Sequence, residues 1–223
     1  MYFQIEARLK KPIYFISGLG ADERVFEYLQ IAGYEPRFIK WIPPKTKESL
    51  QDYATRLRQQ IAVENPVILG VSFGGVMAIE ISKQIDCQKI ILISSVKSRE
   101  ELPITYRLLG CLNLHKLAPT SVLKKANFLT YWFFGTSTAS EKALLKSILE
   151  NTDKDFLRWA INSIVKWNNK NADNRIIHIH GLKDKILPVS NITHLNFKIK
   201  DGGHLMIYNK AQNINSILQA VLN

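Results

Sequence analysis

The sequence contains only two cysteines, Cys87 and Cys111, among its 223 residues. Two cysteines cannot form the framework of several disulfides that is typical of small secreted proteins. Neither belongs to a C-x-x-C pair, which would indicate redox or zinc chemistry. This cysteine usage fits a protein of the reducing cytoplasm.

Long apolar segments are also missing. Because no stretch of about 18 uncharged apolar residues occurs, we expect no membrane-spanning helix. Residues 1–11 mix charged with apolar side chains and lack the apolar centre of an export signal. We therefore expect a protein that is not exported and that is located in the cytoplasm.

The chain has no basic arm, although its formal net charge is +11. Residues 97–174 hold 12 basic and 7 acidic side chains, and the remaining positive charge is spread over the rest of the chain. This distribution favours a lysine-rich solvated surface, so we expect no nucleic-acid partner. It leaves an acidic acyl carrier protein open as a partner.

Phosphate-binding and metal-binding motifs are absent as well. No G-x-x-x-x-G-K-[ST] loop occurs, and in residues 17–23 Glu23 stands where a dinucleotide loop needs its last glycine. The pair His178 and His180 would share one face of a strand, but the chain offers few further ligands at a suitable spacing. We expect no cofactor and no metal.

The sequence does contain a regular alternation of strand and helix patterns. Short apolar, β-branched runs predict strands, and apolar residues three or four positions apart predict helices. The predicted strands are 12–17, 36–39, 67–71, 89–94, 175–180 and 193–200, and the predicted helices are 23–31, 46–63, 76–85 and 210–222. Apolar strands joined through helices predict an α/β fold with a doubly wound, mainly parallel sheet.

Residues 97–174 depart from this alternation. They show helical periodicity, most clearly over 140–150 and 155–167, and no convincing strand. We interpret this segment as a helical layer inserted into a core made of residues 1–96 and 175–223. Its aromatic residues either line a pocket or bury the layer on the core, and packing is the simpler interpretation.

The most informative segment is GVSFGG, residues 70–75, between a predicted strand and a predicted helix. A serine hydroxyl is a poor nucleophile unless it is held exposed beside a base. The G-x-S-x-G elbow holds Ser72 in a strained turn, and the flanking glycines allow close backbone approach. We therefore predict that Ser72 is a nucleophile.

A serine nucleophile needs a histidine base and usually a carboxylate that orients the histidine. Asp184 and His204 each follow a predicted strand, and the carboxyl ends of parallel strands meet at one edge of a sheet. The order Ser72, Asp184, His204 excludes the chymotrypsin-like and subtilisin-like arrangements. Asp184 is preferred to Asp173, which precedes its strand, and to Asp201, which is too near His204 in sequence.

The tetrahedral intermediate also requires two hydrogen-bond donors for its oxyanion. One is expected to be the backbone N–H of Phe73, directly after the nucleophile. The other is expected to be the N–H of Leu19, in the loop after the first strand.

These motifs together resemble those of the α/β-hydrolase superfamily. The resemblance covers residues 12–223 and includes the elbow, the oxyanion loop, an I-H-G-x-x-D-x-x-x-P segment and a terminal G-G-H. It implies a compact, esterase-like serine hydrolase that cleaves an ester or thioester of an acyl group without a cofactor. It also implies that residues 97–174 are the helical cap of this family, whose aromatic side chains would then be candidates for lining an acyl pocket. Two departures are visible: Ser17-Gly18 replaces the His-Gly of many relatives, and residues 1–11 leave little room for the usual leading β-hairpin.

The resemblance leaves other functions open. Acyltransferases and carbon–carbon bond hydrolases share this fold, and some hydrolase-fold proteins serve only as ligand receptors. Serine at the elbow argues against dehalogenase or epoxide hydrolase chemistry, for which similar proteins use aspartate there.

Overall fold

The computed structural model describes residues 10–117, 119–170, 173 and 175–222, and a six-stranded sheet lies at its centre. The strand order is β2-β1-β3-β4-β5-β6, and every neighbouring pair is parallel. The strands are β1 (Lys11–Ile16), β2 (Tyr34–Ile39), β3 (Val67–Val71), β4 (Lys89–Ile93), β5 (Ile176–Gly181) and β6 (Phe197–Ile199). This confirms the predicted parallel α/β sheet. The expectation about a leading hairpin concerns residues 1–9, which lie outside the described residues.

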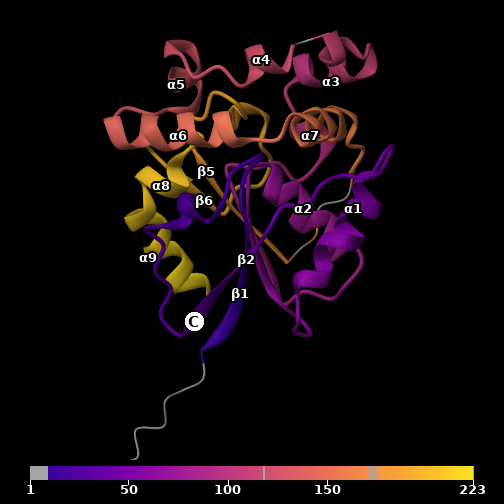
Figure 1. The fold of residues 1–223 in the computed structure, drawn as a ribbon. Helices are drawn as coiled ribbons and strands as arrows, with labels where there is room; N and C mark the ends of the chain where they lie inside the picture. The colour runs from indigo at the N-terminus through magenta and orange to yellow at the C-terminus, as the bar shows by residue number, and fades with distance from the viewer. Residues whose placement is uncertain (1–9, 118, 171–172, 174, 223) are drawn as a thin grey trace, which may run out of the picture.

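Helices cover both faces of the sheet, as the prediction of a doubly wound fold requires (Figure 1). Helices α1 (Leu50–Leu57) and α2 (Phe73–Ser82) lie on one face. Helices α8 (Met206–Asn209) and α9 (Ala211–Leu222) lie on the other. Among the described helices, none is long and apolar enough to cross a bilayer.

The alternating directions of strand side chains explain why both faces are covered. In β1, Tyr14 and Ile16 belong to the core cluster under α1 and α2, whereas Ile13 and Phe15 belong to the cluster under α9. Since successive side chains of a strand point to opposite faces, an all-apolar strand needs a helix layer on each side. Full burial of each such side chain contributes about 1.5–3 kcal/mol.

Helix α1 is shorter than predicted at both ends. It begins after Ser49, whose hydroxyl accepts a hydrogen bond from the backbone N–H of Asp52, and it passes into a 3₁₀ turn over Arg58–Gln60 (η2). Thr46 therefore lies outside the helix, because the capping serine fixes the start.

The predicted helix over 23–31 is wrong. The structure has one 3₁₀ turn there, Glu23–Phe26 (η1). The N–H groups of Gln30 and Ala32 bond instead to the side chains of Asn215 and Gln219 on α9, at 3.0 and 3.1 Å. Partners from a distant helix replace the helical hydrogen bonds of this segment.

The segment between β4 and β5 lies over the carboxyl end of the sheet (Figure 1). Its helices α6 (Ala139–Asn151) and α7 (Lys154–Lys166) confirm the helices predicted at 140–150 and 155–167 and lie next to the sheet. Three shorter helices form an outer layer. The remaining elements are η3 (Arg99–Glu101), α3 (Ile104–Cys111), η4 (Leu114–Leu117), α4 (Thr120–Leu123) and α5 (Phe128–Phe134), with η5 (Val189–Asn191) after β5.

Strand β2 forms one edge of the sheet. It contains Pro36, and Glu35 and Arg37 beside it form an exposed ion pair at 3.0 Å. Proline is tolerated on an edge strand where its nitrogen faces away from the neighbouring strand. The four central residues of β2 are exposed, in contrast to the buried strands of the centre.

Candidate active site

Ser72 lies in a sharp turn between β3 and α2 with φ 52° and ψ −120°. A positive φ at a residue other than glycine costs on the order of 1–3 kcal/mol, so the surroundings must hold it. The N–H of Ser72 donates to the carbonyl of Ile93 at 3.0 Å. The carbonyl of Ser72 accepts from the Ser95 hydroxyl at 2.7 Å and from the N–H of Gly75 at 2.9 Å. These bonds fix the elbow in its strained conformation.

The turn also needs glycine at position 74, because the chain passes very close to the end of β1. A Cβ at Gly74 would lie 2.2 Å from the carbonyl oxygen of Ile16 and 2.4 Å from that of Ser17. Both distances are far below van der Waals contact. Gly74 therefore brings the elbow against the loop that follows β1.

The structure brings Ser72, His204 and Asp184 into one hydrogen-bonded chain. The hydroxyl of Ser72 donates to Nε2 of His204 at 2.9 Å, and Nδ1–H of His204 donates to Oδ2 of Asp184 at 2.9 Å. The carboxylate can only accept, so this geometry assigns the proton of His204 to Nδ1 and leaves the Nε2 lone pair for the serine. Asp184 and His204 are both buried. The three side chains predicted from the sequence as nucleophile, base and acid thus lie within hydrogen-bond distance of one another in succession.

Direct contact between two loops places the carboxylate beside the imidazole. The N–H of Lys183 donates to the carbonyl of Gly202 at 2.9 Å, and a Cβ at Gly181 would lie only 2.2 Å from that same oxygen. Within its own loop, Asp184 Oδ1 accepts from the N–H groups of Ile186 and Leu187, both at 2.9 Å. The histidine loop therefore positions the loop of Asp184, and two backbone N–H groups hold its carboxylate.

Asp184 stays ionised although it is buried. Burial alone would raise the pKa of its carboxyl, but the charge and hydrogen bond of His204 and the N–H of Leu187 lower that pKa below its ordinary value. The two competing aspartates are engaged elsewhere: Asp173 pairs with Arg175 at 2.5 Å, and Asp201 pairs with Lys183 at 2.7 Å. The choice of Asp184 as the acid agrees with this geometry.

The loop after β1 is anchored by groups that stand in for the missing His-Gly pair. The hydroxyl of Ser17 donates to the carbonyl of Ala21 at 2.6 Å. The indole N–H of Trp41 donates to Ser17 Oγ and to the carbonyl of Gly18, both at 3.1 Å. The loop reaches the nucleophile, because a Cβ at Gly18 would lie 3.6 Å from Cβ of Ser72.

Sequence analysis did not identify Trp41. The indole also stacks on the ring of Phe73, with centroids 5.4 Å apart and planes at 17°. Trp41 therefore contacts both predicted oxyanion segments. Its position in the sequence could have indicated a place near the site, because Trp41 lies two residues beyond the end of β2, at the carboxyl edge of the sheet.

The two predicted oxyanion donors lie in the expected segments. Phe73 is the first residue of α2, so its N–H has no acceptor within the helix and lies at the positive end of the helix dipole. Leu19 is half-buried in the loop after β1 and packs against the core cluster that contains Phe73.

His178 and His180 make bonds to backbone carbonyls. Nε2–H of His178 donates to the carbonyl of Ser95 at 3.0 Å, and Nε2–H of His180 donates to the carbonyl of Leu187 at 2.8 Å. His180 Nε2 also lies 3.5 Å from the Asp184 carboxylate, so the pair adjoins the acid. The described part of the chain contains no cluster of three or more His, Cys, Asp or Glu side chains that could hold a metal.

Both histidines are held neutral. Burial lowers the pKa of His178 to about 3, aided by repulsion from His180 and Lys97, and burial is also the main cause that lowers the pKa of His180. Nδ1 of His178 has no hydrogen-bond partner among the described residues, so a proton there would be a buried charge without an acceptor.

This neutrality predicts a loss of stability in acid. In the unfolded chain both histidines bind protons below about pH 6.5, whereas His178 in the folded chain resists protonation down to about pH 3. Lowering the pH therefore favours unfolding, by about 1.4 kcal/mol per pH unit from His178. Urea unfolding at about pH 7 and about pH 5 should show a smaller difference for His178→Gln than for the wild type. Equal differences would contradict the prediction.

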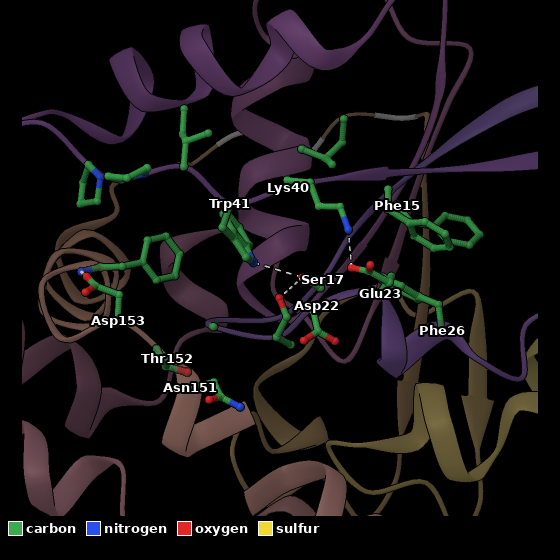
Figure 2. A pocket seen from close by; sticks show the side chains of 18 of the residues that line it. Phe15, Ser17, Asp22, Glu23, Phe26, Lys40, Trp41, Asn151, Thr152 and Asp153 are labelled. Atoms are coloured by element: carbon green, nitrogen blue, oxygen red, sulfur yellow. Dashed lines mark hydrogen bonds and ion pairs between the residues drawn. The ribbon is translucent and has the colours of Figure 1, made fainter. Parts of the chain in front are cut away.

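A cavity of about 580 Å³ lies beside the loop after β1 (Figure 2). Ser17 and Trp41 line it, but Ser72, Asp184 and His204 do not. Its other lining side chains include Phe15, Phe26, Phe38, Phe156, Asp22, Glu23, Lys40, Thr152 and Asp153. Three of its four lining carboxylates have partners: Asp22 bonds Arg24, Glu23 pairs with Lys40 at 2.5 Å, and Asp153 caps α7.

Solved structures similar to this chain are α/β-hydrolase-fold proteins. An esterase from Exiguobacterium antarcticum has a TM-score of 0.66 at 15% identity, over 95% of this chain and 91% of that chain. An N-acyl homoserine lactonase complexed with N-hexanoyl homoserine has a TM-score of 0.67 at 16% identity, over 97% and 90%. A bromoperoxidase from Bacillus anthracis has a TM-score of 0.65 at 18% identity, over 96% and 92%. The protein therefore has the α/β-hydrolase fold, as the sequence motifs predicted.

The comparison with protein-family models matches only part of the chain. Residues 22–104 match the model of an uncharacterised protein family, UPF0227. This match includes the elbow and ends at Ile104, the first residue of α3. The comparison with curated proteins gives no match.

Proposed function

We propose that the protein is a serine hydrolase that cleaves a carboxylic ester or thioester through an acyl-enzyme intermediate. The observation that carries this proposal is the hydrogen-bonded chain from Asp184 through His204 to Ser72, with the serine held in a strained elbow. The esterase and lactonase among the structural neighbours act on esters, which supports the same class of substrate here.

The geometry suits both halves of such a reaction. Ser72 Oγ attacks the acyl carbon while His204 Nε2 accepts its proton, and Asp184 stabilises the resulting imidazolium. The N–H groups of Phe73 and Leu19 stabilise the oxyanion. His204 then gives the proton to the leaving alcohol or thiol, which departs as the acyl-enzyme forms. Water, activated by His204, releases the acid and restores Ser72.

We further propose that residues 97–174 form the cap of this site. The end of α5 lies directly on the histidine loop: the N–H of Leu205 donates to the carbonyl of Phe134 at 3.1 Å, and the rings of Phe134 and His204 lie 5.5 Å apart. A helix in this place limits access to His204. The cap would thereby select the acyl group and the leaving group.

The test combines labelling with a substrate panel. A fluorophosphonate probe should label the wild-type protein, and the protein should hydrolyse some members of a chain-length series of p-nitrophenyl esters and acyl thioesters. Absence of both labelling and turnover would overturn the proposal and favour a ligand-binding protein. Labelling with product formation only when an acyl acceptor is added would indicate an acyltransferase, and cleavage only of carbon–carbon substrates would indicate that alternative.

A further inference from the structure

The outer layer of the cap exposes an unusual number of large apolar side chains. Phe128 is 83% exposed and Leu117 is 76% exposed. We call this surface the outer cap face, and it extends over α3, η4, α4 and α5, which lie farthest from the sheet in Figure 1. Its exposed apolar residues are Ile104, Leu108, Leu109, Leu112, Leu114, Leu117, Val122, Leu123, Phe128, Leu129, Trp132 and Phe133.

The same segment carries charge of one sign only. No Asp or Glu occurs between Glu101 and Glu141, whereas Arg107, Lys116, Lys124 and Lys125 lie within it. Lys116 and Lys125 are exposed.

Lys185, from the loop that carries Asp184, adds to this charge. Its ammonium group lies 3.7 Å from the centroid of the Trp132 ring and donates to the carbonyl of Trp132 at 3.1 Å. The outer cap face is therefore both apolar and cationic.

We infer that the outer cap face binds the surface of a bilayer that contains anionic lipids. Large exposed apolar patches mark interaction sites, and a surface that combines Phe, Leu and Trp with Lys and Arg is typical of proteins that lie in the membrane interface. Apolar side chains enter the headgroup region, while each nearby lysine is attracted by the anionic lipid surface. No acidic side chain within residues 102–140 opposes this attraction.

A protein partner fits these observations less well. An acidic carrier protein would account for the lysines, but it would not require bulky apolar side chains spread over four successive elements. Phe128 and Leu117 are almost wholly in water, which suits side chains that enter a lipid phase. The bilayer explains the apolar residues and the charge together.

The position of the outer cap face relates this binding to the active site. Helix α5 contributes Phe128, Leu129, Trp132 and Phe133 to the face, and its last residue, Phe134, contacts His204. On a docked protein, the seven residues of α5 would lie between the lipid and His204. An amphiphilic ester could then pass from the bilayer to Ser72 without crossing much water.

Sedimentation with vesicles tests the inference independently of hydrolysis. The full-length protein is mixed with vesicles of phosphatidylcholine alone or of phosphatidylcholine with phosphatidylglycerol. We expect binding to the phosphatidylglycerol vesicles, and weaker binding when NaCl is raised to about 1 M, where charges are screened over about 3 Å. The Ser72→Ala protein should bind equally well, so failure of the proposed function would leave this result intact.

Two variants and two matched controls identify the binding surface. Phe128→Asp and the double variant Lys116→Glu/Lys125→Glu should each weaken binding by more than about tenfold. Val63→Asp alters an exposed apolar residue before β3, and Lys10→Glu/Lys11→Glu reverses two charges at the start of β1, both at the opposite end of the sheet. These controls should bind as the wild type does.

Four results would overturn the inference: no binding to anionic vesicles at low salt, equal binding to both kinds of vesicle, cap variants that bind normally, or controls that bind as weakly as the cap variants. Binding to an acidic acyl carrier protein without binding to vesicles would also overturn it and would assign the face to a protein partner.

Discussion

Replacing Ser72 with alanine is expected to lower kcat/KM for ester hydrolysis by about 10⁴-fold to 10⁶-fold and to abolish labelling by a fluorophosphonate probe. The variant lacks the nucleophile, while the oxyanion donors and the substrate contacts remain, so a small residual rate enhancement survives. Alanine keeps the Cβ and removes only the hydroxyl group. The free energy of unfolding should therefore change by less than about 1 kcal/mol.

The matched control is Ser82→Ala. Ser82 is the last residue of α2 and is buried, and its hydroxyl donates to the carbonyl of Ile79 at 2.9 Å instead of to a histidine. Steady-state kinetics and labelling of the control should match the wild type. Normal turnover by Ser72→Ala would show that the nucleophile lies elsewhere in the chain, whatever the fold.

Replacing Asp184 with asparagine is expected to lower kcat by about 10⁴-fold. An asparagine amide can present N–H groups to His204 Nδ1, which favours the tautomer that carries its proton on Nε2. His204 then loses the lone pair that accepts the proton of Ser72. The imidazolium would also lose the only carboxylate that contacts it among the described residues.

Asp201→Asn serves as the control for this variant. Asp201 lies three residues before His204, is exposed and pairs with Lys183 at the surface, where solvent screens the contact. Its kinetics should stay within about twofold of the wild type. A severe defect in Asp201→Asn together with a mild defect in Asp184→Asn would reverse the assignment of the acid.

The sequence predicted the sheet and the meeting of Ser72, Asp184 and His204 for a single physical reason. Buried strands give short apolar runs, and the loops after parallel strands converge at one edge. The chain therefore shows which residues follow strands, and topology brings them together. The distances of 2.9 Å on both sides of His204 agree with that expectation.

Features that depend on side chains from distant segments were not predictable in this way. The 23–31 segment has a helical pattern, but Asn215 and Gln219 of α9 provide its hydrogen-bond partners instead. Trp41 anchors the loop of Ser17 from the segment that follows β2. Neither contact leaves a periodic signal, because each depends on the path of the folded chain.

The exposed face of the cap was missed for a related reason. Residues 104–134 are apolar enough to resemble core, and composition alone does not show which side chains a second layer covers. Helix α7 packs beneath α3 and α4, but Figure 1 shows no element of the described residues outside them. The exposure of these apolar side chains therefore follows only from the three-dimensional arrangement of the helices.

The outer edge of the sheet has its own consequence for how copies of this protein behave at high concentration. A strand from another molecule that approached β2 would meet a missing N–H at Pro36 and the charged pair of Glu35 and Arg37 on either side of it. The hydrogen bonds between β2 and the incoming strand would therefore be interrupted at Pro36. Edge-to-edge growth of the sheet into fibrils through β2 is thereby discouraged by Pro36.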